Sequence, residues 1–144
     1  MTDFKIISGT WADLAKDAEI IRRAVFIQEQ NIAEQDEWDA QDTISHHFVV
    51  YVIEQGASHA IATARLLANN SIGRVAVLKS YRGQGVGRKL MLSIIAQAKQ
   101  EQRNFLTLSA QVHAIAFYQS LGFSVQGEEY LDCGIPHLDM SLAL

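Results

Sequence analysis

The sequence predicts a single α/β (α+β) domain with a mixed, mostly antiparallel central sheet and helices on both faces. Short apolar, β-branched runs alternate with stretches in which apolar residues recur at helical spacing. The chain has 144 residues, of which 49% are hydrophobic, enough to fill the core of one domain. No linker, charge block or internal repeat divides it. We therefore expect one domain over residues 1–144.

The first third of the chain predicts a strand, a turn and a helix, followed by an irregular acidic segment. Residues 4–7 form a short apolar run that ends at Ser8-Gly9-Thr10. Apolar residues then recur three and four positions apart at Leu14, Ala18, Ile21 and Val25. Residues 34–42 are rich in carboxylates, for which we expect a short helix and a solvated loop.

Three β-branched runs in the middle of the chain predict an antiparallel meander. The first run is apolar on both faces, which is typical of a central strand. Turn residues separate the three runs. The expected strands are residues 45–53, 60–67 and 72–78.

The second half predicts two helices and three further strands. After Gly85, one helix face carries Leu90, Met91, Ile94, Ile95 and Ala98. A shorter helix over residues 114–121 ends at Gly122. The expected strands are residues 105–108, 123–125 and 138–142.

Charge and composition exclude several classes of protein. Sixteen acidic residues outnumber twelve basic ones, for a net charge of −4, which disfavours nucleic-acid binding by broad phosphate neutralisation. The one cysteine cannot form an internal disulfide. Neither a secretory leader nor an apolar run long enough to span a membrane is visible. We expect a cytoplasmic protein with no nucleic-acid or membrane partner.

A glycine-rich turn between the third meander strand and the long helix is the most informative segment. Gly83, Gly85 and Gly87 allow backbone N–H groups to approach a ligand, and the helix start adds unpaired donors. Phosphate or pyrophosphate suits such a site. Gly87 is followed by Arg88-Lys89 rather than Lys-Ser/Thr, so this turn is not a P-loop. A solvent-exposed turn without a ligand is the alternative.

Arg82, Gly85 and Gly87 match the acyl-CoA signature Gln/Arg-x-x-Gly-x-Gly/Ala of the GNAT acetyltransferases, which this chain resembles along essentially its whole length. The second signature of that family is similar to Ala114, Phe117-Tyr118 and residues 121–123. Residues 25–30 and 134–137 resemble a small bacterial subgroup, the YjcF-like proteins.

The resemblance implies a GNAT fold in which a splayed strand pair holds CoA. Val75, Ala76 and Val77 would pair with the pantetheine arm, and the Val77 N–H would polarise the thioester carbonyl. Tyr118 would protonate the departing thiolate. The other cofactor-binding residues implied are Arg82, Gly83, Gln84, Gly85, Val86, Gly87 and Arg88 in the pyrophosphate cradle, and Gln111, Ala114 and Phe117 beside it. Gln111 stands where the family often has asparagine, which puts that contact in doubt.

The implied activity is transfer of an acetyl group from acetyl-CoA to a primary amine of a small molecule or peptide, by direct attack in a ternary complex. No metal is expected. A general base is needed because amines are protonated at neutral pH, and Glu29 is the first candidate. The alternatives are a non-catalytic acyl-CoA sensor and, less favoured, a thiol nucleophile at Cys133 with His137 as its base. His113 could also reach the site, and a homodimer stays open.

Overall fold

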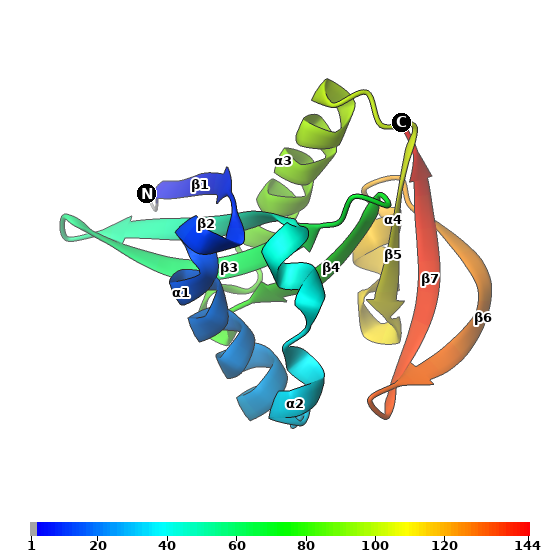
Figure 1. The fold of residues 1–144 in the computed structure, drawn as a ribbon, viewed down its shortest axis with the longest axis horizontal. Coiled ribbons are helices and arrows are strands. Elements are labelled where there is room, and N and C mark those ends of the chain that lie inside the picture. The colour runs from blue at the N-terminus through cyan, green and yellow to red at the C-terminus, as the bar shows by residue number, and fades with distance from the viewer. Residues whose placement is uncertain (1–2) are drawn as a thin grey trace.

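A computed structural model describes residues 3–144, which form one seven-stranded sheet with helices on both faces (Figure 1). The strand order is β1-β2-β3-β4-β5-β7-β6. The strands are β1 (Asp3–Gly9), β2 (His46–Glu54), β3 (Ala57–Leu66), β4 (Ser71–Val77), β5 (Phe105–Gln111), β6 (Ser124–Asp132) and β7 (Ile135–Ala143). The predicted fold class is confirmed.

Four α-helices and four shorter or irregular helical segments connect these strands. The α-helices are α1 (Trp11–Arg22), α2 (Glu34–Glu37), α3 (Val86–Gln100) and α4 (Ile115–Gln119). The other segments are the π-helical η1 (Arg23–Glu29) and the 3₁₀ turns η2 (Ala40–Ile44), η3 (Lys79–Tyr81) and η4 (Val112–Ala114). Within residues 3–144, no helix has the length and apolar character needed to cross a membrane.

Strands β2, β3 and β4 form the predicted antiparallel meander, and β1 pairs antiparallel with the other edge of β2. Alternate residues of β2 face opposite sides of the sheet, as side chains on a strand must. The ring of His46 stacks on Phe48 on one side, and the ring of His47 lies 4.7 Å from that of Trp11 on the other. The two histidines therefore pack on opposite faces of the sheet.

Each face of the sheet has its own hydrophobic core. Leu90 and Ile94 of α3 are fully buried against Phe48 and Val50 on one face. Ala18 and other residues of α1 pack with Val49 and Ala76 on the opposite face. Burying each large aliphatic side chain stabilises the fold by about 1.5–3 kcal/mol. The helical spacing read from the sequence therefore identifies the buried faces of both helices.

The acidic segment is not the solvated loop we expected. Glu37 and Asp42 are 2% and 3% exposed, and both contact the buried guanidinium of Arg22 at 2.7 Å. Arg65 of β3 reaches Asp42 and Asp39 from the other side. These ion pairs fasten α2 and η2 to α1 and the sheet, since removing one partner would leave a buried charge uncompensated.

The last hairpin is longer than its sequence pattern predicts. Strand β6 extends to Asp132 instead of ending at residue 125, and β7 begins at Ile135 instead of residue 138. Every residue of β6 is exposed, so no apolar alternation marks it. Cys133 and Gly134, with φ of 51° and 77°, form the two-residue turn, a conformation typical of tight hairpins.

Candidate active site

Strands β4 and β5 meet at one end and then diverge (Figure 1). Their parallel pairing is limited to Ser71 with Thr107 and Ile72 with Leu108. Beyond this point a bulge bends β4, because two residues, Arg74 and Val75, stand opposite a single residue of β3. The backbone of Arg74 has a φ of 52°, which is uncommon for a residue with a side chain. The splayed strand pair that the resemblance implied is therefore present.

A cavity of about 980 Å³ lies at this opening. It is bounded by β4, the glycine-rich turn, the start of α3, α4, η1 and the β6–β7 turn. The predicted site residues that line it are Glu29, Val75, Ala76, Val77, Arg82, Gly83, Gly85, Val86, Gly87, Arg88, Gln111, Ala114, Phe117 and Tyr118. Gln84 is the exception. Its side-chain amide donates to the carbonyl of Ser80 on the exposed side of the turn.

The backbone N–H of Val77 points into the splay. In an antiparallel ladder, the N–H groups of alternate residues face the partner strand. The N–H of Leu78 donates to Ile61 on β3, so that of Val77 points the opposite way, where β5 has already diverged. The carbonyl of Val77 accepts a hydrogen bond from Arg82 Nε at 2.9 Å. This leaves one donor of β4 directed at the cavity.

The glycine-rich turn and the start of α3 form a cluster of backbone donors. Gly83 and Gly85 have φ of 78° and 81°, and a Cβ built on either would meet no neighbouring atom within 4 Å. Gly85 caps α3 without any side-chain bond, so the first N–H groups of the helix have no partner within it. A Cβ on Gly87 would lie 3.4 Å from the ring of Phe117. The backbone N–H groups of this turn can therefore come close to a phosphate.

Arg82 and Glu29 form a two-pronged ion pair across the cavity. The distances from the guanidinium nitrogens to the carboxylate oxygens are 2.7 and 2.8 Å. The hydrogen bond to Arg82 lowers the pKa of Glu29, although partial burial opposes this shift. A carboxylate with both oxygens bound to arginine is a weakened proton acceptor.

Tyr118 lies on α4 at the back of the cavity and is 8% exposed. Its ring makes edge contacts with those of Phe117 and Phe123. Burial raises the pKa of the phenol to about 12. No hydrogen bond to its hydroxyl is found within residues 3–144. The phenol therefore keeps its proton and is free to donate it to a ligand.

Gln111 connects two sides of the cavity. Its side-chain nitrogen donates to Gln30 of η1 at 3.0 Å, and its oxygen lies 2.7 Å from Nε2 of His113. Both its amide nitrogen and its amide oxygen thus have protein partners. Because both amide atoms are already hydrogen-bonded, a contact from Gln111 to the cofactor is disfavoured.

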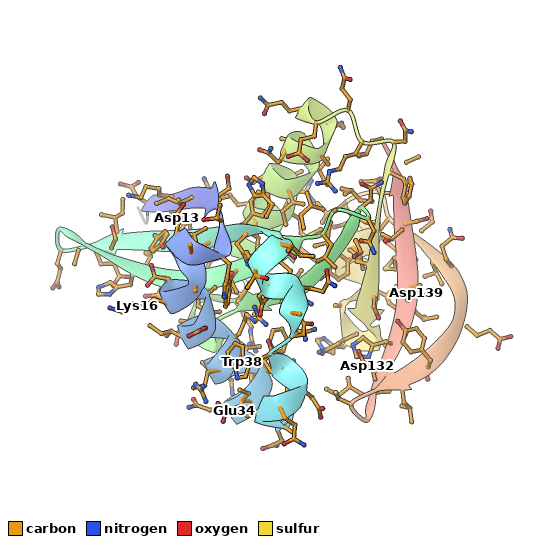
Figure 2. The ribbon with its side chains drawn as sticks, in the orientation of Figure 1. Asp13, Lys16, Glu34, Trp38, Asp132 and Asp139 are labelled. Atoms are coloured by element: carbon orange, nitrogen blue, oxygen red, sulfur yellow. The ribbon has the colours of Figure 1, made fainter. Side chains whose placement is uncertain are left out.

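One wall of the cavity carries Ser109 of β5 with Asp132 and His137 of the β6–β7 hairpin, and further polar residues lie beside it. Ser109, Tyr130 and Asp139 form a hydrogen-bonded chain, with 2.6 Å between the Tyr130 hydroxyl and Asp139. His137 stacks on Tyr130 and also lines the cavity. Asp132 lies at the end of the same hairpin, and Asp139 is further along β7 (Figure 2). Strand pairing brings these residues together, and only His137 belongs to a segment, residues 134–137, that carried a resemblance.

The thiol of Cys133 lines the cavity but is not activated. Burial, and then the nearby carboxylates of Asp132 and Asp36, raise its pKa. A nucleophilic cysteine needs the opposite environment. Within residues 3–144, no group of three His, Cys, Asp or Glu side chains is arranged to hold a metal ion. The lining instead combines backbone donors, two phenols, imidazoles and carboxylates.

The family model of the acetyltransferase (GNAT) domain matches residues 15–144. The chain belongs to the GNAT acetyltransferase family. It is 37% identical over 129 residues to the Bacillus subtilis protein named "Uncharacterized N-acetyltransferase YjcF", covering 87% of this chain and 89% of that protein. The expected resemblance to the YjcF-like proteins is thereby confirmed.

Solved structures agree with this membership in the GNAT family. An acyl-CoA N-acyltransferase from Pseudomonas aeruginosa has a TM-score of 0.83 and 30% identity, covering 98% of this chain and 100% of that one. Escherichia coli ElaA has a TM-score of 0.79 and 28% identity, covering 99% of both chains. Both solved structures therefore share the overall fold of this chain.

Proposed function

We propose that this GNAT protein transfers an acetyl group from acetyl-CoA to a primary amine of a small molecule or peptide, by direct attack in a ternary complex. The observation that carries the proposal is one cavity that unites the splayed β4, with its free Val77 N–H, and the donor cluster at the start of α3. An extended arm can pair with β4 while its phosphates meet the glycine-rich turn. CoA contains both parts, a pantetheine arm joined to a pyrophosphate.

Binding in this scheme depends mainly on backbone groups. The N–H groups at the start of α3, with the positive end of the helix dipole, hold the pyrophosphate, and Arg82 and Arg88 add positive charge. Val75, Ala76 and Val77 supply the strand that the pantetheine arm extends. Ala114 and Phe117 cover the arm from the other side of the cavity.

Two groups act on the thioester. The N–H of Val77 donates to the carbonyl oxygen and stabilises the negative charge that develops there during attack. Tyr118 gives its proton to the sulfur as the C–S bond breaks. Its buried position keeps it protonated at neutral pH, as an acid must be.

The names of the relatives support the reaction class. The Bacillus subtilis relative is named as an N-acetyltransferase, and the Pseudomonas aeruginosa structure is described as an acyl-CoA N-acyltransferase. Glu29 as the general base stays a prediction, and its ion pair with Arg82 weighs against that role. The cytoplasmic location and the homodimer also stay predictions.

The test is release of free thiol from acetyl-CoA in the presence of a library of primary amines, with an acetylated amine found by mass spectrometry. An acyl-CoA sensor would instead bind acetyl-CoA saturably in calorimetry and release no thiol with any amine. Intact-mass spectra during turnover test direct transfer. An acetyl group on Cys133 would contradict it.

A further inference from the structure

We infer that His137 is the proton acceptor for the attacking amine. This inference rests on the proposed function and adds the base that the reaction requires. His137 is 8% exposed and lines the same cavity as Val77 and Tyr118. It lies on β7, directly opposite Gln111 of β5. A histidine at this position belongs to the acceptor side of the cavity.

The hydrogen bonding of His137 fixes which ring nitrogen can accept a proton. Nδ1 lies 2.7 Å from the carbonyl oxygen of Ile135. A carbonyl oxygen can only accept, so Nδ1 carries the hydrogen. In the neutral ring, Nε2 then holds the free lone pair. No partner for Nε2 is found in the described part of the chain, so this lone pair is available to the cavity.

The other histidines of the second half and of β2 are differently placed. Nε2 of His113 faces the side-chain oxygen of Gln111 at 2.7 Å, and Nε2 of His47 faces the carbonyl of Asp42 at 2.8 Å. His47 does not line the cavity. His113 lines it but is exposed, whereas His137 is 8% exposed.

The neighbours of His137 hold the ring in place. Its ring stacks on Tyr130 with centroids 6.1 Å apart and an angle of 23° between planes. Tyr130 is itself bonded to Asp139 and Ser109. The titratable groups on the elements around the ring are Glu128, Glu129, Tyr130 and Asp132 on β6, Asp139 on β7, Cys133 in the turn and His113 in η4. Any pH effect on His137 must be separated from these groups.

The protons balance as follows. The amine enters as an ammonium and loses one proton to Nε2 of His137, which becomes an imidazolium. The neutral nitrogen attacks the carbonyl carbon, a C–N bond forms and the C–S bond breaks, and the electron pair leaves with sulfur. Tyr118 gives the proton that the thiolate takes up. After attack, the nitrogen loses a second proton, which passes through solvent and reprotonates the Tyr118 phenolate. The imidazolium returns its proton to water.

His137→Asn is the sharpest variant, because the amide nitrogen of asparagine can keep the bond to the Ile135 carbonyl while Nε2 is lost. We expect kcat/KM for the amine to fall about 10²- to 10⁴-fold near neutral pH, as for loss of a general base. The deficit should narrow as the pH rises toward the pKa of the amine. KM for acetyl-CoA should not change. Added imidazole should restore part of the activity of His137→Ala, which a purely structural role would not allow.

His59→Asn is the matched control, since His59 is exposed on β3 away from the cavity. It should keep the wild-type rate and pH profile. If His137→Asn remains folded, retains kcat/KM within about threefold and keeps the wild-type pH profile, the assignment is overturned. The same applies if imidazole fails to rescue a folded His137→Ala.

A measurement without any amine separates this inference from the proposed function. Long-range ¹H–¹⁵N spectra of the wild-type protein should show neutral His137 with its hydrogen on Nδ1. A hydrogen on Nε2 would overturn the inference even in an active enzyme. If wild type releases no thiol with any amine, the proposed function fails instead, whatever the tautomer.

Discussion

Glu29 and Arg82 connect the two halves of the cavity. The carboxylate belongs to η1, and the guanidinium belongs to the turn that leads into α3. Arg82 also donates to the Val77 carbonyl, so one side chain contacts both η1 and the splayed strand. The pair therefore links η1 to β4 and to the glycine-rich turn.

Glu29→Gln should act through Arg82 rather than through proton transfer. Loss of the charge pair frees the guanidinium, and we expect KM for acetyl-CoA to change by about three- to tenfold, as for a partly exposed pair. The pH profile of kcat should keep its wild-type shape. Steady-state kinetics with both substrates varied would check this. A 10²-fold or larger fall in kcat with loss of the acidic limb would make Glu29 the base after all.

Gly85→Val should abolish acetyl-CoA binding in calorimetry. A β-branched residue tolerates a φ of 81° poorly, and its side chain would project into the space where the phosphates are held. Gly56→Val is the control, because Gly56 has a φ of 77° in the β2–β3 turn and does not line the cavity. Both variants should lose thermal stability to a similar degree. Normal binding by Gly85→Val would mean that the cradle is misplaced.

Arg82→Ala should weaken acetyl-CoA binding only modestly, by about tenfold or less, because backbone donors carry most of the phosphate contact. Calorimetry of Arg82→Ala and Gly85→Val under the same conditions compares their affinities for acetyl-CoA. A complete loss with Arg82→Ala would shift the main contribution from the backbone to the side chain.

Tyr118→Phe should lower kcat about 10²- to 10⁴-fold, the usual contribution of a positioned acid. KM for acetyl-CoA should stay nearly constant because the ring contacts with Phe117 and Phe123 remain. Burial raises the pKa of Tyr118, so the phenol stays protonated as the pH rises. No alkaline loss of kcat from this group is therefore expected up to about pH 10. Full kcat in Tyr118→Phe across the pH range would return Tyr118 to a packing role.

Arg22→Ala should be strongly destabilising, by about 3–5 kcal/mol, because Glu37 and Asp42 would stay buried with only one arginine each, Arg74 and Arg65 respectively. Its neighbour Arg23 makes an exposed pair with Glu34. Arg23→Ala should therefore cost much less stability than Arg22→Ala. Urea unfolding of the two variants measures the difference, and equal losses would show that the buried pairs do not stabilise this segment.

Asp39 should make stability depend on acid pH. The hydrogen bond from Arg65 lowers the pKa of Asp39 to about 2. Because the folded-state pKa is lower, its contribution is complete above the unfolded pKa of about 4 and is lost as the pH falls toward 2. Asp39→Asn should flatten this decline in urea titrations between these pH values. An unchanged acid profile would show that Asp39 does not contribute to this pH dependence of stability.

Local patterns in the sequence were sufficient for most of the fold. The 3.6-residue periodicity of α3 and the β-branched run of β2 depend only on neighbouring positions, and both were predicted correctly. Residue type also permits the positive φ of Gly83 and Gly85, which a residue with a side chain would rarely adopt. By contrast, β6 was predicted too short because an exposed edge strand leaves no apolar alternation in its sequence.

The sequence by itself determined the helices, the meander and the glycine-rich turn, because periodicity and backbone freedom are properties of short segments. Only the tertiary structure decided which side chains share the cavity. The pair of Glu29 with Arg82, the burial of Glu37 and the position of His137 opposite Gln111 join residues far apart in the chain. Such contacts depend on strand register and packing between distant elements, for which a single sequence has no local signal.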